Sequence, residues 1–501
     1  MDIIWLNPIF LSPNDDNGYD ISDYREIMRE FGTMEDFDRL LKEIHKREMR
    51  LVLDLVVNHT SDEHPWFEEA RKSRHNPYYN YYHWWPAEKG EPPLRLSYFD
   101  EEGNAWTYNK PTDSYYLHYF SRKQPDLNWE NPEVRQEIFD MMRFWFDKGI
   151  DGFRMDSISL IAKDPSFPLI DSKKYPDIFS FYAKEPRLHL YLHEMNRQVL
   201  SKYDCMSVGE GSAVMVDDVA KFVDPAREEL NMLYHFDAAR IRNTTLPDNP
   251  ESGIDYSLIA LKKMFTEWDK AVDKGWPSIY LGNHDQPRMV SRFGSDKDEF
   301  RALSAKMLIT FLLTMRGTPY WFAGDEIGMR NIRFDHIEDY NDIDTINRYK
   351  KAKAEGKDPQ AVLDEQKETG RDNARTPFQW DRSPEAGFTA GTPWLKVNPD
   401  YTWINVADEE KDPTSILNYF KKVVSFRKEN PSLIYGSYHL LDAENPQSYT
   451  FLRKTGADTY LIMLNFSHKA AISTPGIDMS NAHVLLDNYG DRSHMAVSYT
   501  H

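Results

Sequence analysis

Short apolar runs alternate with amphipathic stretches along most of the chain. Residues 3–8 (IIWLNP) and 51–58 (LVLDLVVN) are apolar runs of strand length. Between them, residues 33–47 place Phe37, Leu40, Leu41 and Ile44 on one face of a helix with about 3.6 residues per turn. Strands that alternate with helical stretches in this way are typical of repeated βα units around a parallel sheet.

The pattern predicts seven strands of the parallel type, each ending in polar or charged residues. These strands cover residues 3–8, 51–58, 151–157, 206–210, 229–236, 278–285 and 318–326. The main helices are expected at residues 33–47, 132–148, 257–273 and 300–315. The predicted fold class is α/β, a (β/α)8 TIM barrel. Because such a barrel needs eight strands and none precedes residue 3, we expect its first βα unit, about 30 residues, to be missing.

The barrel pattern is interrupted by other segments, which gives the expected domain organisation. Residues 1–60 form the first part of the barrel, which starts at its second strand, and residues 61–125 form a subdomain inserted after the third strand. Residues 126–435 complete the barrel and include a charged helical excursion at about 330–370. Residues 436–501 show short alternating runs, which predict a C-terminal antiparallel β domain that stops before its last strand.

Composition and charge narrow the class of partner. The chain has 61 basic and 81 acidic residues, and its net charge of -20 repels nucleic acid and anionic membranes. One cysteine, Cys205, excludes an internal disulfide framework. No apolar run approaches the roughly 20 residues of a membrane span, and the N-terminus lacks the basic region of a signal peptide. We therefore expect a cytoplasmic protein, monomeric, that binds a small neutral substrate.

Charged and polar side chains stand at the ends of several predicted strands. Arg154 and Asp156 lie two residues apart and share a strand face, so the guanidinium should lower the pKa of the Asp156 carboxyl. Glu210 ends another strand, and Asp285 ends a third. Because the carboxyl ends of barrel strands meet at one rim, these three carboxylates should converge. Such a group can cleave glycosidic bonds or bind a divalent metal ion, and the pattern leaves both open.

Six sequence blocks resemble the α-amylase family of glycoside hydrolases, in particular its oligo-1,6-glucosidase and α-glucosidase branch. They occur in the family's order and with its spacing over nearly the whole chain. The blocks are DLVVNHT (54–60), QPDLNW (124–129), GFRMD (152–156), VGE (208–210), LGNHDQPR (281–288) and RDNARTPFQW (371–380).

The resemblance implies a retaining double displacement. Asp156 would be the nucleophile, Glu210 the general acid/base with a raised pKa, and Asp285 the transition-state stabiliser. Retention requires the first two carboxyl groups to lie about 5–5.5 Å apart. The resemblance also implies a set of residues that bind the terminal sugar. These are Asp16, Tyr19, His59, Arg154, His284 and Arg375.

The same resemblance implies an exo-acting enzyme, because the block around Asp16 and Tyr19 marks that branch. We expect no cofactor, since the family's calcium loop would lie in the missing N-terminal unit. The function predicted is an α-glucosidase that cleaves α-1,6 bonds, α-1,4 bonds or both at the non-reducing end of short oligosaccharides. Ser157, directly after Asp156, leaves the linkage preference open, and the balance of hydrolysis and transglucosylation stays open too.

Three other functions are weighed against this one. Sucrose isomerases of the family carry an arginine-rich loop, which residues 255–276 do not contain. A trehalose-phosphate hydrolase would need a cationic phosphate pocket that the sequence does not locate. A truncated, non-catalytic carbohydrate-binding relative is the third alternative, but such proteins typically lose one of the three carboxylates, and all three are present here.

Overall fold

The computed structural model describes residues 2–99, 103–175, 177–249, 251, 253–456 and 458–489. The chain divides into two compact units. The first consists of Met1–Phe236, Ala271–Trp276 and Asp342–Lys357, and the second of Asp237–Lys270, Pro277–Asn341 and Asp358–His501. The domain boundaries expected from the sequence stay predictions, as does the absence of a leading βα unit.

A five-stranded parallel sheet organises the first unit. Its strands, in sheet order, are β1 (Ile3–Leu6), β4 (Arg50–Val56), β8 (Gly152–Asp156), β9 (Met206–Glu210) and β10 (Met232–Tyr234). All five were predicted as strands, although β10 is shorter than expected. The register pairs Val56 with Asp156 and Tyr234 with Glu210, so the carboxyl ends of four neighbouring strands are level. This edge of the sheet carries the candidate site.

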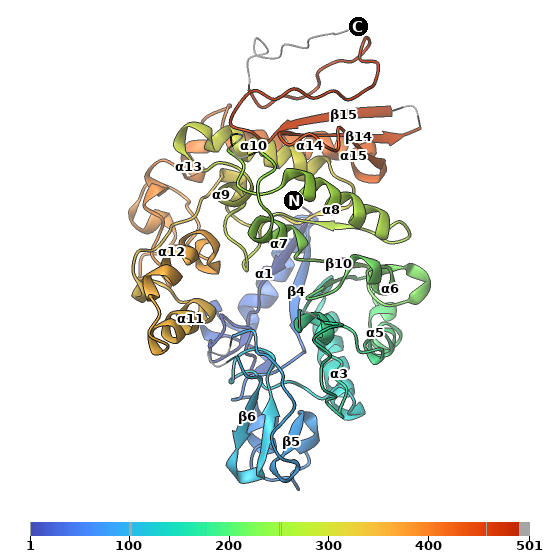
Figure 1. The fold of residues 1–501 in the computed structure, drawn as a ribbon, viewed down its shortest axis with the longest axis vertical. Helices are drawn as coiled ribbons and strands as arrows, with labels where there is room; N and C mark the ends of the chain where they lie inside the picture. Colours follow the sequence, from blue (N-terminus) through green and yellow to red (C-terminus); the bar gives the residue numbers. More distant parts are fainter. Residues whose placement is uncertain are drawn as a thin grey trace. The chain divides into compact units, whose positions relative to one another are not determined.

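Helices connect these strands (Figure 1). They include α1 (Met34–Lys46), α3 (Pro132–Lys148), α4 (Phe179–Tyr182), α5 (Arg187–Gln198) and α6 (Ala220–Val223). The ends of α3 are where the sequence predicts them. Asn131 accepts a hydrogen bond from the Glu133 amide, and Gly149 closes the helix at φ 108°, a left-handed conformation that favours glycine. The helix buries Ile138 and Trp145 against the core.

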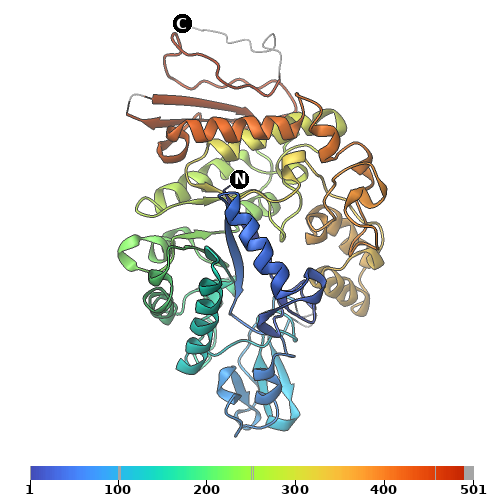
Figure 2. The same ribbon diagram turned by 180° about the vertical axis from the view of Figure 1, so that it is seen from behind.

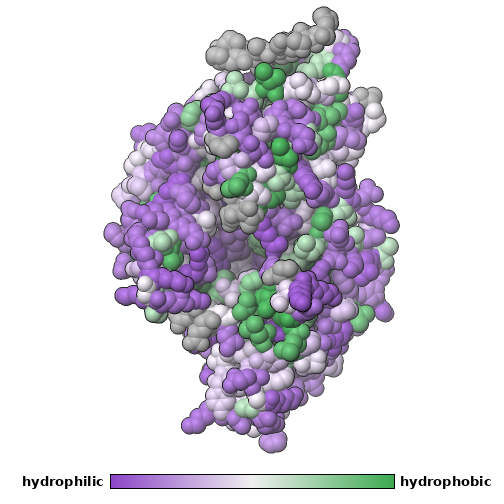
Figure 3. Space-filling model, viewed as in Figure 1, coloured by the Kyte–Doolittle hydropathy of each residue, from purple (hydrophilic) through white to green (hydrophobic). Residues whose placement is uncertain are grey.

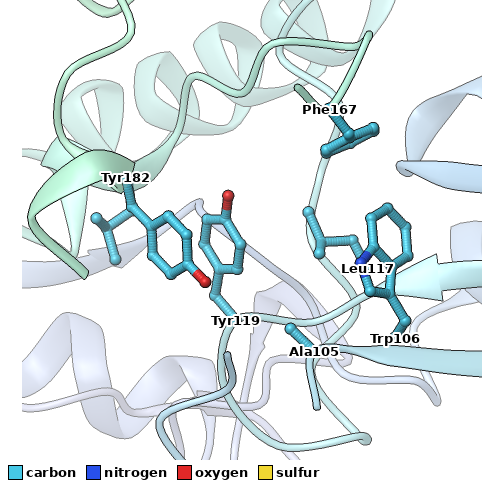
Figure 4. Close-up of a cluster of buried hydrophobic side chains, with 7 residues drawn as sticks. Ala105, Trp106, Leu117, Tyr119, Phe167 and Tyr182 are labelled. Carbon is cyan, nitrogen blue, oxygen red and sulfur yellow. The ribbon is translucent and has the colours of Figure 1, made fainter. Parts of the chain in front are cut away.

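The long connection between β4 and β8 forms its own small sheet. It contains α2 (Pro65–Ala70) and the antiparallel strands β5 (Trp84–Pro86), β6 (Trp106–Asn109) and β7 (Ser114–Leu117). A buried cluster joins this sheet to the segment that follows β8 (Figure 4). Within it, the rings of Tyr119 and Tyr182 stack with centroids 4.0 Å apart. The inserted segment is therefore anchored to the chain that follows Asp156.

A two-stranded ribbon, β2 (Phe10–Leu11) and β3 (Asp23–Ile27), and the helix α11 (Ile343–Ala354) also belong to this unit.

The second unit contains the other two predicted parallel strands and the C-terminal sheet. The strands β11 (Ser278–Ile279) and β12 (Thr318–Pro319) pair in parallel. Both are much shorter than predicted. After β11 ends at Ile279, the chain turns at Asn283, whose side chain accepts a hydrogen bond from the Asp285 amide. The helices of the second unit include α7 (Asp237–Thr244), α9 (Met289–Phe293), α10 (Asp298–Thr314), α12 (Pro359–Thr369) and α13 (Val406–Glu409). The helix α8 (Leu258–Ala271) belongs to this unit apart from its last residue.

The predicted antiparallel sheet after residue 436 is present. It consists of β13 (Ser437–Leu441), β14 (Ser448–Thr455) and β15 (Asp458–Asn465), in that order. The helix α14 (Ile416–Glu429) runs along this sheet, followed by α15 (Pro431–Tyr435), as Figure 2 shows. Within the described ranges, no helix combines the length and the apolar character that crossing a bilayer requires.

Candidate active site

The strand β8 places Arg154 and Asp156 on one face and Phe153 and Met155 on the other. All its residues are buried, and Gly152 allows close packing, because a Cβ there would lie 2.2 Å from the Met206 carbonyl oxygen. The chain turns sharply after Asp156, since Ser157 adopts a left-handed φ of 41°. Asp156 therefore stands at the carboxyl end of its strand, at the start of a loop.

The guanidinium of Arg154 joins the two carboxylates predicted to react. Its side chain is fully buried. Nη1 donates to Asp156 Oδ1 at 2.9 Å, and Nη2 donates to Glu210 Oε2. Because Asp156 and Glu210 end neighbouring strands, one cation can contact both and fix their relative position. The distance between the two carboxyl groups and the raised pKa of Glu210 stay predictions.

A third carboxylate, Asp54, completes the charge around Arg154 and was not among the predicted site residues. It accepts from Arg154 Nη1 at 2.8 Å and from the Tyr19 hydroxyl at 2.9 Å. Burial raises the pKa of Asp54 to about 6, and the nearby guanidinium opposes this. The sequence held a signal for this residue, because a charged side chain inside the apolar run LVLDLVVN must find a buried partner.

Two hydroxyl groups bind Glu210, and neither was predicted. The Tyr234 hydroxyl donates to Glu210 Oε2 at 3.1 Å, and Ser212 Oγ donates to Oε1 at 2.9 Å. Tyr234 also accepts from Arg154 Nε at 3.1 Å. Its position follows from the register of β10 against β9, which the sequence pattern does not specify. Both oxygens of the predicted acid/base are thus held in place.

A second polar cluster in the same unit contains three of the residues predicted to bind the terminal sugar, Asp16, Tyr19 and His59. His59 Nε2 lies 3.0 Å from the Tyr19 carbonyl oxygen. Gln124, from the QPDLNW block, donates to Asp16 Oδ2 at 3.1 Å. Burial lowers the pKa of His59 to about 3, so its imidazole is neutral at pH 7 and can form hydrogen bonds without adding charge.

The second unit builds a compact ion cluster around Asp285. His284 Nε2 lies 3.1 Å from Asp285 Oδ2, and Arg371 and Arg375 donate to Oδ1 at 3.3 and 3.2 Å. Burial alone would raise the pKa of Asp285, but these three neighbours hold it well below its ordinary value. Asp285 is therefore a stable carboxylate. Arg371, which lies in the RDNARTPFQW block, was not among the predicted site residues.

The structure places the predicted residues in two groups, one in each unit. The first unit brings together Asp16, Tyr19, His59, Arg154, Asp156 and Glu210. The second brings together His284, Asp285 and Arg375. That both groups form one site stays a prediction. Among the described residues, His, Cys, Asp and Glu side chains form no group of three or more that could hold a metal ion.

Comparison with known proteins gives a consistent picture. The model described as "Alpha amylase, catalytic domain" matches residues 1–436. An oligo-1,6-glucosidase of Parageobacillus thermoglucosidasius is 52% identical over 481 residues, which cover 94% of this chain and 84% of that protein. A trehalose-6-phosphate hydrolase of Bacillus subtilis is 42% identical over 497 residues, with 97% and 87% covered.

A solved structure agrees with these relatives. The isomaltulose synthase from Protaminobacter rubrum matches with a TM-score of 0.89 and 44% identity, and the match covers 94% of this chain and 84% of that one. The family resemblance drawn from the six sequence blocks is thereby confirmed. The chain belongs to the α-amylase family of glycoside hydrolases and has its architecture, a TIM barrel with a C-terminal β domain.

Proposed function

We propose that the protein is a retaining, exo-acting α-glucosidase that releases glucose from the non-reducing end of short α-linked oligosaccharides. The observation that carries the proposal is the buried guanidinium of Arg154, which contacts both Asp156 and Glu210 at neighbouring strand ends. The oligo-1,6-glucosidase named above supports α-1,6 bonds as the first substrates to test.

The contacts suggest how each carboxyl group acts. Asp156 attacks the anomeric carbon and forms a glycosyl–enzyme ester, while Glu210 donates its proton to the departing glycosidic oxygen. Glu210 then removes a proton from water, which attacks the anomeric carbon and releases Asp156. The product keeps the α configuration because the carbon is inverted twice. The proposal includes Asp285 as the carboxylate that binds the sugar hydroxyls beside this reaction.

The Asp16, His59 and Gln124 cluster is suited to hold the terminal glucose. Its donors and acceptors are neutral or anionic, and all three side chains are buried. Hydroxyl groups of an uncharged sugar can exchange hydrogen bonds with such a cluster. A phosphorylated disaccharide would instead require a cationic pocket, so trehalose 6-phosphate hydrolysis is the less favoured alternative. Sucrose isomerisation is likewise less favoured, because residues 255–276 lack the arginine-rich loop. Independence from cofactors, a monomeric state and a cytoplasmic location stay predictions.

Kinetics of an Asp156→Asn variant test the mechanism. Its kcat/KM for an aryl α-glucoside should fall by about 10⁴-fold or more, because the nucleophile is lost while Asn keeps the shape of the side chain. For the wild type, NMR should show α-glucose as the first product. Glucose release from isomaltose, maltose, sucrose and trehalose 6-phosphate, compared in parallel, gives the substrate preference. Undiminished turnover by the variant, or β-glucose as the first product, would contradict the proposal.

A further inference from the structure

Two large indole rings are exposed at the end of the RDNARTPFQW block and on the segment that follows it. Trp394 is 60% exposed and Trp380 51% exposed. Folded proteins usually bury most of a tryptophan, and the face shown in Figure 3 is largely hydrophilic, with its apolar side chains in separate patches. An exposed apolar residue alone needs no explanation. The contacts of Trp394, however, distinguish it from Trp380.

The ring of Trp394 is held in a fixed orientation. Its Nε1 donates to the Arg375 carbonyl oxygen at 2.8 Å. The ring of Phe388 meets it edge to face, with centroids 5.0 Å apart and an interplanar angle of 89°. The polar atom of the indole is thereby satisfied within the protein, while most of its ring stays open to solvent. This arrangement suits an aromatic surface that receives a ligand.

The anchor of Trp394 is a residue of the Asp285 cluster. Arg375 Nη2 donates to Asp285 Oδ1, and its Nε donates to the His284 carbonyl oxygen at 2.8 Å. One arginine therefore connects the exposed indole to Asp285, the third predicted catalytic carboxylate. Trp380 differs from Trp394, because its ring packs on Phe378, with centroids 4.6 Å apart.

The backbone around this segment is tightly turned. Glu385, Ala386 and Gly387 adopt φ angles of 54°, 56° and 66°, all in the left-handed region. The amides of Trp380 and Asp381 both donate to the Ala386 carbonyl oxygen, at 2.9 and 3.1 Å. This compact turn precedes Phe388, which packs against Trp394, so the aromatic pair is presented by an ordered part of the surface.

We propose that Trp394 is a stacking platform for a second sugar unit of the substrate, on the side of the leaving group. The inference rests on the proposed function, because an exo-acting enzyme holds only the terminal glucose beside the reacting carboxylates. Every further sugar must then lie on the leaving-group side. The carbon–hydrogen face of a pyranose packs on an aromatic face, so the ligand is a neutral gluco-oligosaccharide of two or more units.

Substrates of different length test this assignment. In Trp394→Ala, kcat/KM for isomaltotriose should fall roughly threefold to tenfold, the size of one aromatic contact. The kcat/KM for methyl α-glucoside, whose leaving group carries no second sugar, should stay within a factor of two. The matched control, Trp380→Ala, removes a similarly exposed indole from the same segment and should leave both values unchanged.

A conservative variant shows whether Trp394 binds a sugar itself or only positions Arg375. Trp394→Phe keeps an aromatic face but cannot donate to the Arg375 carbonyl oxygen. It should retain most of the wild-type kcat/KM for isomaltotriose. If Trp394→Phe loses as much as Trp394→Ala, or if both variants lose activity on methyl α-glucoside equally, Trp394 acts through Arg375 and the platform is wrong.

Binding measurements test the Trp394 platform separately from the proposed α-glucosidase function. Isothermal titration of isomaltotriose into the full chain carrying Asp156→Asn should give a roughly threefold to tenfold higher Kd when Trp394→Ala is added. The Kd for glucose should not change. An unchanged Kd for isomaltotriose would overturn the platform, whatever the enzyme's activity. Failure of the wild type to hydrolyse any α-glucoside would overturn the proposed function instead.

Discussion

The residue with the most consequential contacts is Arg154, which binds the carboxylates of Asp54, Asp156 and Glu210. Asp54 should matter for activity although it lies within β4 and not at the end of the strand. In Asp54→Asn, the guanidinium loses a charged acceptor on one side, so its contacts with Asp156 and Glu210 should shift. We expect kcat/KM for an aryl α-glucoside to fall by about 100-fold, the effect of a displacement near 1 Å at a reacting centre. Steady-state kinetics at pH 7 measure this.

The control for Asp54→Asn is Asp151→Asn, at the amino end of β8. Asp151 accepts from the Leu51 amide at 2.8 Å and lies 2.8 Å from His45 Nε2, so its loss should affect stability. Because that end of the barrel is remote from the candidate site, kcat/KM should change less than threefold. Equal losses of activity in the two variants would show that Asp54 acts only through stability.

The sequence predicts the site residues unevenly, for reasons that can be named. Arg154 and Asp156 are visible because the strand period of two puts them on one face. Asp54 could have been found from the sequence, because it is a charged residue inside an apolar run. Tyr234 could not, because its contact with Glu210 depends on the register of two strands joined by more than 20 residues.

At the scale of elements, Arg453 of β14 joins the C-terminal sheet to two helices. Its guanidinium is fully buried and donates to carbonyl oxygens of Thr314, Leu433 and Gly436, at or just beyond the ends of α10 and α15. Burial lowers the pKa of Arg453 to about 9. Arg453→Met should lower the free energy of unfolding by about 3 kcal/mol, because the Thr314 and Gly436 carbonyls lose this donor, whereas Leu433 keeps its bond from Arg427. Urea denaturation followed by circular dichroism measures the change.

The matched control, Arg382→Met, removes an exposed arginine from the same unit. Its guanidinium side chain is 66% exposed and pairs with Asp408 at 2.6 Å. An exposed ion pair contributes little, so the free energy of unfolding should change by less than about 1 kcal/mol. If Arg453→Met costs no more than this control, the carbonyl contacts of Arg453 do not stabilise the sheet.

Element positions were more predictable than element lengths. All seven predicted parallel strands are present, and α3 has the caps that its flanking residues specify. The strand before Asp285 was predicted through residue 285 but ends at Ile279, and residues 283–285 form a turn in which the Asn283 side chain accepts from the Asp285 amide. The contact of Arg453 with α10 was out of reach, since its carbonyl partner there, Thr314, lies more than 100 residues away in the sequence.

At the scale of the whole molecule, pH changes the stability of the protein through two sets of buried groups, carboxyl groups and histidines, whose effects have opposite signs. Burial raises the pKa of Asp54 and Asp126 to about 6, which costs stability as pH rises from about 4 to 6. Burial lowers the pKa of His59 and His64 to about 3. An unfolded histidine has a pKa of about 6.5, so the unfolded state binds the proton first as pH falls. Each of these histidines therefore costs stability as pH drops from about 6.5 towards 3, and the two sets partly cancel between pH 4 and 6.

His64 offers the clearest test of this balance. Its Nδ1 accepts from the Trp66 amide at 3.2 Å and caps α2. Asn can accept the same bond but does not titrate, so His64→Asn keeps the cap and removes one proton-binding difference. Between pH 6.5 and 4.5 the variant should lose less stability than the wild type, by about 1.4 kcal/mol per pH unit. Thermal unfolding at both pH values measures this as a smaller fall in Tm.

The control is His75→Asn, which replaces an exposed histidine of the same segment and should follow the wild type. An equal fall in Tm for His64→Asn and the wild type would mean that His64 becomes protonated without unfolding, and that acid sensitivity arises at other buried groups.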